Sequence, residues 1–311
     1  MAVVPNFLVA GAARAGTTAL IEGLRLHPDV FVTQPKEPHY FAYHGLPIEF
    51  KGPGDDQWVN KVVVNDLEKY LGLFGAAGDT PARGDGSVTT LYFADRAAGE
   101  ILRVNPEMRI IVLLREPVAR AFSSFAYLRL RGAETETDFR RALDVEASRK
   151  AAGWHHMWHY DGMSRYASDL RTLYDVVGRS QVRVWFYDDL QANYEQVLNE
   201  VVAFLELQPF PTRSLTMPRV NVSGAARLVV AQRLIHWATE HESVRSAIKR
   251  VVPFETRERV RSSIVRRQDL STATLDDLAP RFAGDLTELA ALLPENQPHW
   301  LGRYAFGRRC E

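Results

Sequence analysis

Short apolar runs that alternate with helix-like patterns fill the first two-thirds of this 311-residue chain. The clearest run is I-I-V-L-L at 110–114, and shorter runs lie at 7–10, 30–32 and 182–187. A continuous apolar run is typical of a strand buried on both faces, and strands separated by helices are typical of a parallel sheet. The pattern therefore predicts an α/β fold in three layers, with a central, mostly parallel sheet flanked by helices.

The segments between these runs carry helix signals. We expect helices at about 17–26, 117–131 and 194–205. The first ends before His27-Pro28, because a residue that precedes proline disfavours the helical conformation. Pro117 suits the first turn of the second helix, where its missing N–H costs nothing. Each predicted helix thus follows a predicted strand, as the α/β fold requires.

The last third of the chain differs in charge. Residues 213–270 contain 12 basic and 5 acidic side chains, an excess of seven positive charges. Their pattern is helical, and two interpretations stay open. One is a solvated helical face; the other is a basic flap, including Arg219, Asn221 and Arg227, that closes over an anionic ligand.

The expected domain organisation follows from these two parts. We predict one domain over 1–311, with an α/β core at 1–210 that holds the main site. A helical C-terminal section at 211–311 would pack on that core.

Charge and cysteine content limit the partners and the compartment. The whole chain carries 38 basic and 38 acidic side chains, which argues against a long nucleic acid or a membrane surface as partner. The single cysteine, Cys310, permits no intrachain disulfide and favours a reducing, cytoplasmic location. No apolar run approaches the ~20 residues of a membrane span. Pro5 and Arg14 interrupt the apolar N-terminal stretch, so we interpret it as structure rather than a signal peptide.

The sequence G-A-A-R-A-G-T-T at 11–18 lies between the first predicted strand and helix. Free amides and the helix dipole make such a junction an anion site, and glycines let the backbone approach the ligand. The glycine spacing equals that of a nucleotide-triphosphatase P-loop, so the fold is expected to be P-loop-like. However, Thr17 stands where that loop has lysine, and the cation is Arg14. This suits a phosphate ester with less charge at the reacting group; the alternative is an ordinary strand–helix turn.

A second group of polar residues follows the run at 110–114. Arg115 comes directly after it, Ser123 lies in the next predicted helix, and Arg120 adds a cation between them. Ligands of open α/β sheets bind at the carboxyl ends of the strands. Arginine offers a planar fork for a phosphate, and serine offers a hydroxyl donor. Two anion sites at such strand ends indicate a ligand with two separated phosphate groups, unless Arg115 merely forms a salt bridge.

Several motifs together resemble one family. Besides the loop at 11–18 they are Q-P-K-E-P-H-Y-F at 34–41, D-G-S-V-T-T-L-Y-F at 85–93, R-E-P-V-A-R-A-F-S-S-F at 115–125, G-M-S-R-Y-A-S-D-L at 162–170 and V-W-F-Y-D-D-L at 184–190. Their order and spacing resemble sulfotransferases that use 3′-phosphoadenosine-5′-phosphosulfate (PAPS). The relatives that the motifs favour are bacterial sulfotransferases similar to the sulfotransferase domains of heparan sulfate biosynthesis. This chain lacks the C-terminal disulfide loop and Lys-Gly-Arg motif of the heparan enzymes.

The resemblance implies a role for each motif. PAPS would be the co-substrate, without a metal. The residues implied for the 5′-phosphosulfate are Arg14, Ala15, Gly16, Thr17 and Thr18, and those for the 3′-phosphate are Arg115 and Ser123.

Catalysis would use the same loop and the K-E-P-H motif. Glu37 falls on the family's catalytic carboxylate and would take the acceptor proton, while Arg14 would stabilise the leaving phosphate as a clamp or an acid. His39 is the alternative base, since we expect positions 37 and 39 to face the same side of a strand.

The segment W-H-H-M-W-H at 154–159 has three interpretations. His155 and His159 at i, i+4 would suit a metal if they were helical, but no third ligand is identifiable. A buried aromatic segment and an acceptor-binding wall are the others. We expect the acceptor wall to come from loops such as 43–60 and 153–162.

The predicted function is transfer of a sulfuryl group from PAPS to a hydroxyl or amine. The acceptor, a small molecule or a carbohydrate, and the oligomeric state are left open. The alternatives are a P-loop-type kinase or nucleotidase and a non-catalytic nucleotide-binding module.

Overall fold

A computed structural model describes residues 3–210, 215–218, 224–226, 265–267 and 270–304. A parallel five-stranded sheet in the order β2-β3-β1-β4-β5 forms its centre. The strands are β1 (Phe7–Gly11), β2 (Val30–Val32), β3 (Ala82–Asp85), β4 (Arg109–Leu114) and β5 (Val182–Phe186). Every residue of β1 is buried, as are the last five residues of β4. The predicted parallel sheet, with its continuous apolar strands inside, is confirmed.

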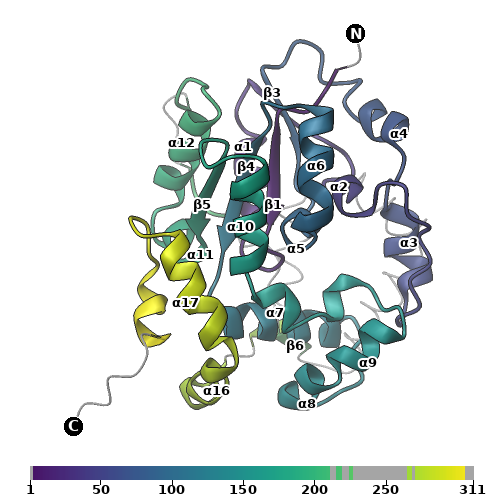
Figure 1. The fold of residues 1–311 in the computed structure, drawn as a ribbon, viewed down its shortest axis with the longest axis vertical. Helices are drawn as coiled ribbons and strands as arrows, with labels where there is room; N and C mark the ends of the chain where they lie inside the picture. The colour runs from purple at the N-terminus through teal and green to yellow at the C-terminus, as the bar shows by residue number, and fades with distance from the viewer. Residues whose placement is uncertain (1–2, 211–214, 219–223, 227–264, 268–269, 305–311) are drawn as a thin grey trace.

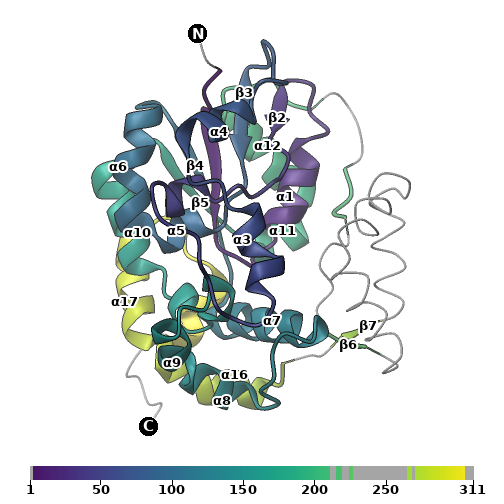
Figure 2. The same cartoon turned by 90° about the vertical axis from the view of Figure 1, so that its right-hand side faces the viewer.

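Helices cover both faces of the sheet (Figures 1 and 2). One face carries α6 (Ala94–Val104) and α10 (Ala167–Val176), which pack against each other. The other face carries α1 (Thr17–Leu24), α11 (Tyr187–Ala192) and α12 (Tyr194–Phe204). The predicted three layers are therefore present, and the fold class is confirmed.

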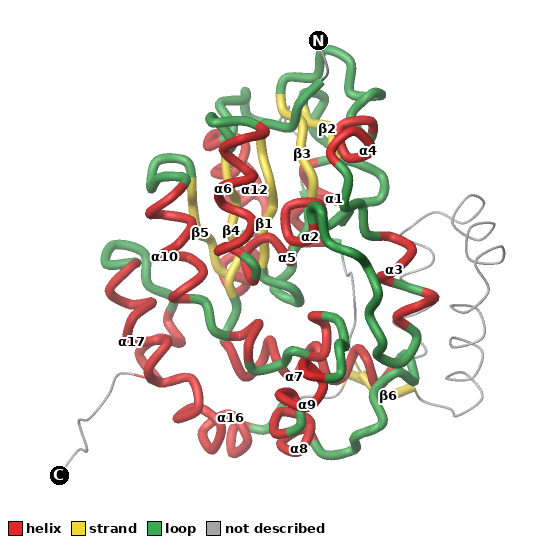
Figure 3. Tube along the Cα trace, turned by 45° about the vertical axis from the view of Figure 1, so that its right-hand side comes forward, coloured by secondary structure: helices red, strands yellow, loops and turns green. Residues whose placement is uncertain are grey.

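Another group of helices lies at the carboxyl ends of the strands (Figure 3). It consists of α7 (Pro117–Leu130), α8 (Phe139–Asp144) and α9 (Glu146–Ala151). The Glu116 side chain caps α7 by accepting from the amides of Val118 at 3.1 Å and Ala119 at 2.6 Å. Pro117 takes the first helical position, as predicted. The sequence after β4 thus places α7 across the strand ends, where open α/β sheets bind ligands.

Short helices fill the connections after β2 and β3. They are α2 (Tyr40–Tyr43), α3 (Val59–Val62), α4 (Leu67–Gly72) and α5 (Thr89–Tyr92). The three-residue 3₁₀ helices in and near this part are η1 (Asp55–Gln57), η2 (His156–Trp158) and η3 (Gly162–Ser164).

The C-terminal section is helical where the structure describes it continuously. It contains α16 (Thr272–Leu278), η4 (Ala279–Phe282), α17 (Ala283–Leu292) and η5 (His299–Tyr304). These helices pack on α7 and α10, and the predicted helical C-terminal section is confirmed there. The division at residue 210 stays a prediction.

Two short described segments of the basic section are strands rather than helices. β6 (Gly224–Ala226) and β7 (Val265–Arg267) form an antiparallel pair, so the predicted helical pattern is wrong at these positions. Arg219, Asn221 and Arg227, on which the flap interpretation rests, lie outside the described residues.

Candidate active site

The loop that joins β1 to α1 keeps its predicted place at a strand end, and two glycines fix its position. Gly16 has a φ of 92°, and an added Cβ would lie 2.9 Å from Cδ2 of Tyr187. At Gly11 an added Cβ would lie 2.8 Å from Cβ of Leu91. Real side chains do not pack that closely, so both positions require glycine. The loop consequently sits tightly between α5 and α11, with the N-terminus of α1 turned to the cavity described below.

The two predicted anion sites meet. Arg115 donates from Nη1 to the carbonyl oxygen of Arg14 at 3.0 Å, and Arg14 donates from Nε to Oγ of Ser123 at 3.3 Å. The Arg115 guanidinium also lies over the Tyr187 ring, 4.5 Å from its centroid. Residues from the loop, the end of β4 and helix α7 therefore form one cationic surface, as the strand-end argument predicted.

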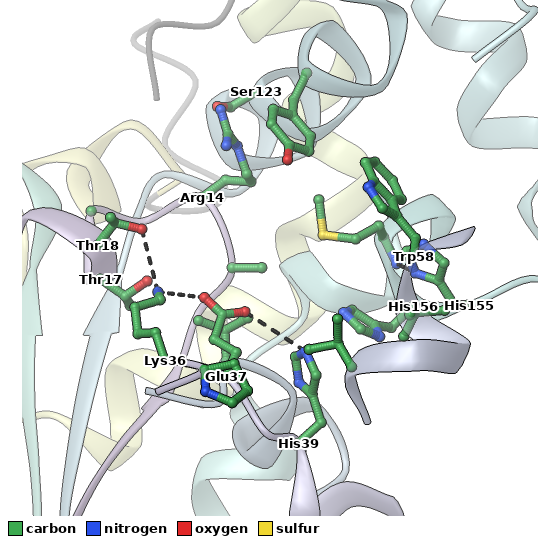
Figure 4. A pocket seen from close by; sticks show the side chains of 18 of the residues that line it. Arg14, Thr17, Thr18, Lys36, Glu37, His39, Trp58, Ser123, His155 and His156 are labelled. Carbon is green, nitrogen blue, oxygen red and sulfur yellow. Dashed lines mark hydrogen bonds and ion pairs between the residues drawn. The ribbon is translucent and has the colours of Figure 1, made fainter. Parts of the chain in front are cut away.

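Lys36 completes this surface, and sequence reasoning missed it. Its Nζ lies 3.3 Å from Oγ1 of Thr18 and forms an ion pair with Glu37. Figure 4 shows Lys36 between the loop residues Thr17 and Thr18 and the carboxylate of Glu37. A lysine is absent from position 17, but the loop after β2 supplies one that contacts the neighbouring Thr18. The lysine missing from a P-loop pattern was the signal to look for another cation.

Glu37 and His39 lie together, but not on a strand. β2 ends at Val32, and both residues belong to the following loop, with His39 in the left-handed conformation at φ 60°. The strand-based expectation for positions 37 and 39 is therefore wrong. Their pairing nevertheless holds, since Nε2 of His39 lies 3.9 Å from Oε2 of Glu37. The loop after β2 brings the two side chains together where strand alternation was expected to do so.

The D-G-S-V-T-T motif holds His39 in place. The amide of His39 donates to Oγ of Ser87 at 2.9 Å, and Nδ1 lies 2.9 Å from Oγ1 of Thr89. The amide of Ser87 in turn donates to Oδ1 of Asp85 at the end of β3. The family motif at 85–93 thus orients the candidate base from the neighbouring strand end.

Electrostatics keep both candidate bases unprotonated at neutral pH. Removal from water raises the pKa of Glu37, but Lys36, His39 and Arg14 lower it more, so it lies below its usual 4.5. Burial lowers the pKa of His39 below its usual 6.5, although Glu37 opposes the shift. Either group can therefore accept a proton near neutrality.

The wall opposite the loop includes residues from both 43–60 and 153–162, the loops expected to form the acceptor wall. Figure 4 shows Trp58 beside His155 and His156, across the cavity from Thr17 and Thr18. Burial lowers the pKa of both histidines well below the usual value, which keeps them neutral. The segment 154–159 is thus both buried and part of the cavity wall.

The metal interpretation of this segment fails on geometry. His155 precedes η2 and contacts Asp55 at 3.2 Å, whereas His159 binds the Tyr92 hydroxyl at 3.1 Å. The i, i+4 helical pair that it required is therefore not formed. Among the residues that the structure describes, no group of three or more His, Cys, Asp or Glu could hold a metal ion.

Ala15 and Arg120 are buried within the protein and do not line the cavity. Ala15 is buried and its amide donates to the carbonyl of Ala12 at 3.2 Å, so it does not line the cavity. Arg120 is fully buried and donates from Nη2 to the carbonyl of Tyr160 at 2.8 Å and from Nε to Oγ of Ser164 at 2.6 Å. Arg120, the further cation of this stretch, therefore ties α7 to the following loops.

All these walls surround one cavity of about 460 Å³, a volume typical of a site for small ligands. The predicted residues that line it are Arg14, Gly16, Thr17, Thr18, Glu37, His39, Arg115 and Ser123. The two predicted anion sites and a paired Glu–His therefore face one space. The fold and this site define an α/β protein with a P-loop-like loop at the edge of a cationic cavity.

Comparisons with known proteins show which proteins this chain is similar to. A model of the sulfotransferase family matches residues 79–212. The crystal structure of a sulfotransferase from Alicyclobacillus acidocaldarius superimposes with a TM-score of 0.73 at 25% identity, covering 96% of this chain and 99% of that one. The predicted resemblance to the sulfotransferase family is confirmed, and the chain has the sulfotransferase fold.

Curated relatives match over part of their length. Heparan sulfate glucosamine 3-O-sulfotransferase 6 of Mus musculus is 31% identical over 127 residues, which cover 39% of this chain and 30% of that protein. Carbohydrate sulfotransferase 15 of Homo sapiens is 22% identical over 272 residues, which cover 72% of this chain and 47% of that protein. This chain thus spans less than half the length of these relatives.

None of the helices in the described ranges has the length and the apolar character needed to cross a membrane.

Proposed function

We propose that this chain is a PAPS-dependent sulfotransferase of the bacterial type, which moves a sulfuryl group from PAPS to a hydroxyl or amine of a small-molecule or carbohydrate acceptor. One observation carries the proposal. The loop at 11–18 and the Arg115–Ser123 pair line the same cavity as Glu37. PAPS carries anionic groups at both ends of its ribose and a reactive sulfuryl at one of them, so its charges match these surfaces.

The residues would divide the nucleotide between them. Gly16, Thr17 and Thr18 at the start of α1, together with Lys36, would hold the 5′-phosphosulfate through amides, hydroxyls and charge. Arg115 and Ser123 would hold the 3′-phosphate. Arg115 also donates a hydrogen bond to the carbonyl oxygen of Arg14, so one connected surface would bind both ends of the nucleotide.

Transfer would proceed by attack of the acceptor oxygen or nitrogen on the sulfur. A new bond to sulfur forms, and the bond from sulfur to the 5′-phosphate oxygen breaks, leaving its electron pair on that oxygen. Glu37 takes the proton that the acceptor loses. Arg14, whose guanidinium cannot easily give up a proton, acts as a clamp for the charge on the departing phosphate. The products are the sulfated acceptor and 3′-phosphoadenosine 5′-phosphate (PAP).

Lys36 supports both halves of this mechanism. Its ammonium contacts Thr18 on the loop and Glu37 beside the acceptor. It therefore adds positive charge where the leaving phosphate develops negative charge, and it lowers the pKa of the base. No step requires a metal. The single cysteine supports a reducing compartment such as the cytoplasm.

Incubation of the chain with radiolabelled PAPS and an acceptor panel tests the proposal. The panel contains 2-naphthol, hexylamine and N-acetylglucosamine, and labelled products are separated by chromatography. We expect labelled product with at least one acceptor. A chain that fails to bind PAP but hydrolyses Mg²⁺-ATP would instead be a nucleotidase, and PAP binding without transfer to any acceptor would indicate a non-catalytic module.

A further inference from the structure

The cavity wall that faces the phosphate loop is mainly apolar. Its apolar lining residues include Trp58, Val59 and Val62 around α3 and Met157 in η2. Val88, before α5, also lines the cavity but clusters with Ala13 of the loop at 11–18. The charged side chains of the lining are Arg14, Lys36, Glu37, Arg115 and Arg131. All but Arg131 belong to the proposed nucleotide and proton-transfer surfaces, so the lining sorts into a charged half and an apolar half.

Arg131 is a charged side chain beside the apolar half, and aromatic rings hold its guanidinium. Its guanidinium carbon lies 3.2 Å from the centroid of the Trp58 ring and 5.5 Å from that of Tyr127. Trp58 and Tyr127 are nearly parallel, at 11°, with centroids 6.4 Å apart. The cation is therefore engaged by aromatic faces from α7 and from the start of α3, and it joins those two elements.

Besides Arg131, this half has two uncharged imidazoles. His155 and His156 line the cavity beside Met157, and their buried rings are neutral at physiological pH. Nδ1 of His156 is 2.9 Å from the Tyr43 hydroxyl. These rings add a flat, weakly polar surface. An uncharged ligand can pack against it, whereas a polyanion gains no favourable charge interaction from neutral rings.

The apolar wall is held in place before any ligand binds. Oδ2 of Asp55 accepts from the amide of Gly52 at 2.7 Å and from that of His155 at 3.3 Å, which ties the α3 segment to the 154–159 segment. Oδ1 of Asn60 accepts from the amide of Phe50 at 3.1 Å. A preformed wall of this kind favours a rigid ligand, because little chain entropy is lost on binding.

From this arrangement we infer that the acceptor is an uncharged alcohol with a flat apolar body, such as an aryl alcohol, rather than a sulfated or carboxylated polysaccharide. The hydroxyl lies at Glu37, and the body packs against Trp58, Val59 and Val62. Burial of the apolar body supplies the affinity. The inference rests on the proposed function and specifies its acceptor class. Sulfuryl transfer then yields an aryl sulfate ester and PAP, and the phenolic proton goes to Glu37.

The test compares acceptors on the full chain with saturating PAPS. The two acceptors are 2-naphthol and a heparan sulfate oligosaccharide, and kcat/KM is measured for each. We expect 2-naphthol to be favoured about 10- to 100-fold, because the saccharide cannot use the apolar wall. Isothermal titration of 2-naphthol into PAP-saturated protein gives a second readout that needs no turnover.

Two variants on α3 distinguish an effect on the apolar wall from an effect on the fold. Val62→Thr keeps the shape and adds a hydroxyl to the wall, so the KM for 2-naphthol is expected to rise about 3- to 10-fold with the KM for PAPS unchanged. Lys61→Gln changes an exposed neighbour on the same helix and is expected to leave both values unchanged.

The outcomes are distinct. Absence of PAP binding contradicts the proposed function itself. PAP binding with no transfer to 2-naphthol, or with a preference for the oligosaccharide, overturns the inference and leaves the nucleotide site standing. An unchanged KM for 2-naphthol in Val62→Thr also overturns it, since the wall would then not contact the acceptor.

Discussion

The two halves of the cavity are built in different ways. The phosphate half comes mainly from two continuous stretches at neighbouring strand ends, 11–18 after β1 and 115–123 after β4, with Lys36 added from the loop after β2. The acceptor half comes from side chains at 58–62 and 155–157, which meet only in the folded chain. A strand end and a helix start fix the first half locally, whereas packing among loops fixes the second. For a site of the first kind the sequence predicts the residues themselves, whereas for the second kind it predicts the contributing loops but not the contacts between them.

The halves also differ in charge. Arg14, Lys36 and Arg115 make the phosphate half cationic, while neutral histidines and aliphatic side chains line the acceptor half. Glu37 lies at the boundary. Substitutions in the first half should therefore change nucleotide binding, those in the second should change acceptor binding or local stability, and a substitution at the boundary should change turnover.

The boundary substitution Glu37→Gln is expected to have the largest effect. Glutamine keeps the size of the side chain but cannot take the acceptor proton, so kcat should fall by about 10²- to 10⁴-fold. Radiolabelled transfer to the best acceptor measures it, and calorimetry should show that PAP still binds. Glu68→Gln, on the exposed side of α4, is the matched control. Turnover near normal in Glu37→Gln would assign the base elsewhere, with His39 the first alternative.

Arg115→Lys should be the next largest effect, and it is confined to the phosphate half. Lysine keeps the charge but loses the fork and the bond to the Arg14 carbonyl, so the Kd for PAP should rise about 10- to 100-fold. The matched control is Arg109→Lys at the opposite end of the same strand, where Arg109 pairs with Glu206. Equal Kd values for PAP in the two variants would show that Arg115 does not contribute to nucleotide binding.

Lys36→Met should change the pH profile. Among the neighbours that lower the pKa of Glu37, Lys36 has the largest effect, so its removal raises that pKa. Because the base must be unprotonated, the acid-side fall in kcat/KM should move to higher pH, and kcat/KM at neutral pH should fall about 10-fold from lost phosphate stabilisation. Lys69→Met, on exposed α4, serves as the control. If the acid-side fall in kcat/KM stayed at the same pH in Lys36→Met, Lys36 would not influence the pKa of the catalytic base.

Asp55→Asn should have the smallest effect, on stability alone. Burial raises the pKa of Asp55 to about 6, above its usual 3.8, so the native state holds this proton more tightly than the unfolded chain. The resulting stabilisation is present below pH 3.8 and is lost as the pH rises through about 6. Asparagine cannot titrate. Relative to Asp55→Asn, the unfolding free energy of the native sequence should therefore fall by about 1–3 kcal/mol between pH 4 and pH 7.

Urea unfolding at both pH values measures this difference. Asp56→Asn, at the exposed neighbouring position, should show no such difference. A constant difference for Asp55→Asn across the range would mean that Asp55 titrates normally and does not hold the acceptor wall as a buried group.

The same contrast explains what the sequence could predict. The strand at 110–114 and the helix from Pro117 were predictable because apolar runs and proline positions act locally. The strand β3, A-R-G-D, was missed because two of its four residues are charged and pairing with β1 and β2 defines it. The place of Lys36 beside Thr18 depends on the turn after β2, which no periodicity reveals. Trp58 and Arg131 meet through tertiary packing alone.

The central claim is that this cavity binds a nucleotide with phosphate groups at both the 3′ and the 5′ position. Isothermal titration of PAP, 5′-AMP and Mg²⁺-ATP into the full chain tests it without reference to any acceptor. Arg115 and Ser123 should contribute about 2–3 kcal/mol through the 3′-phosphate, so PAP should bind about 30- to 150-fold more tightly than 5′-AMP, and more tightly than Mg²⁺-ATP. Binding of 5′-AMP as tight as that of PAP, or tighter binding of Mg²⁺-ATP, would contradict the account.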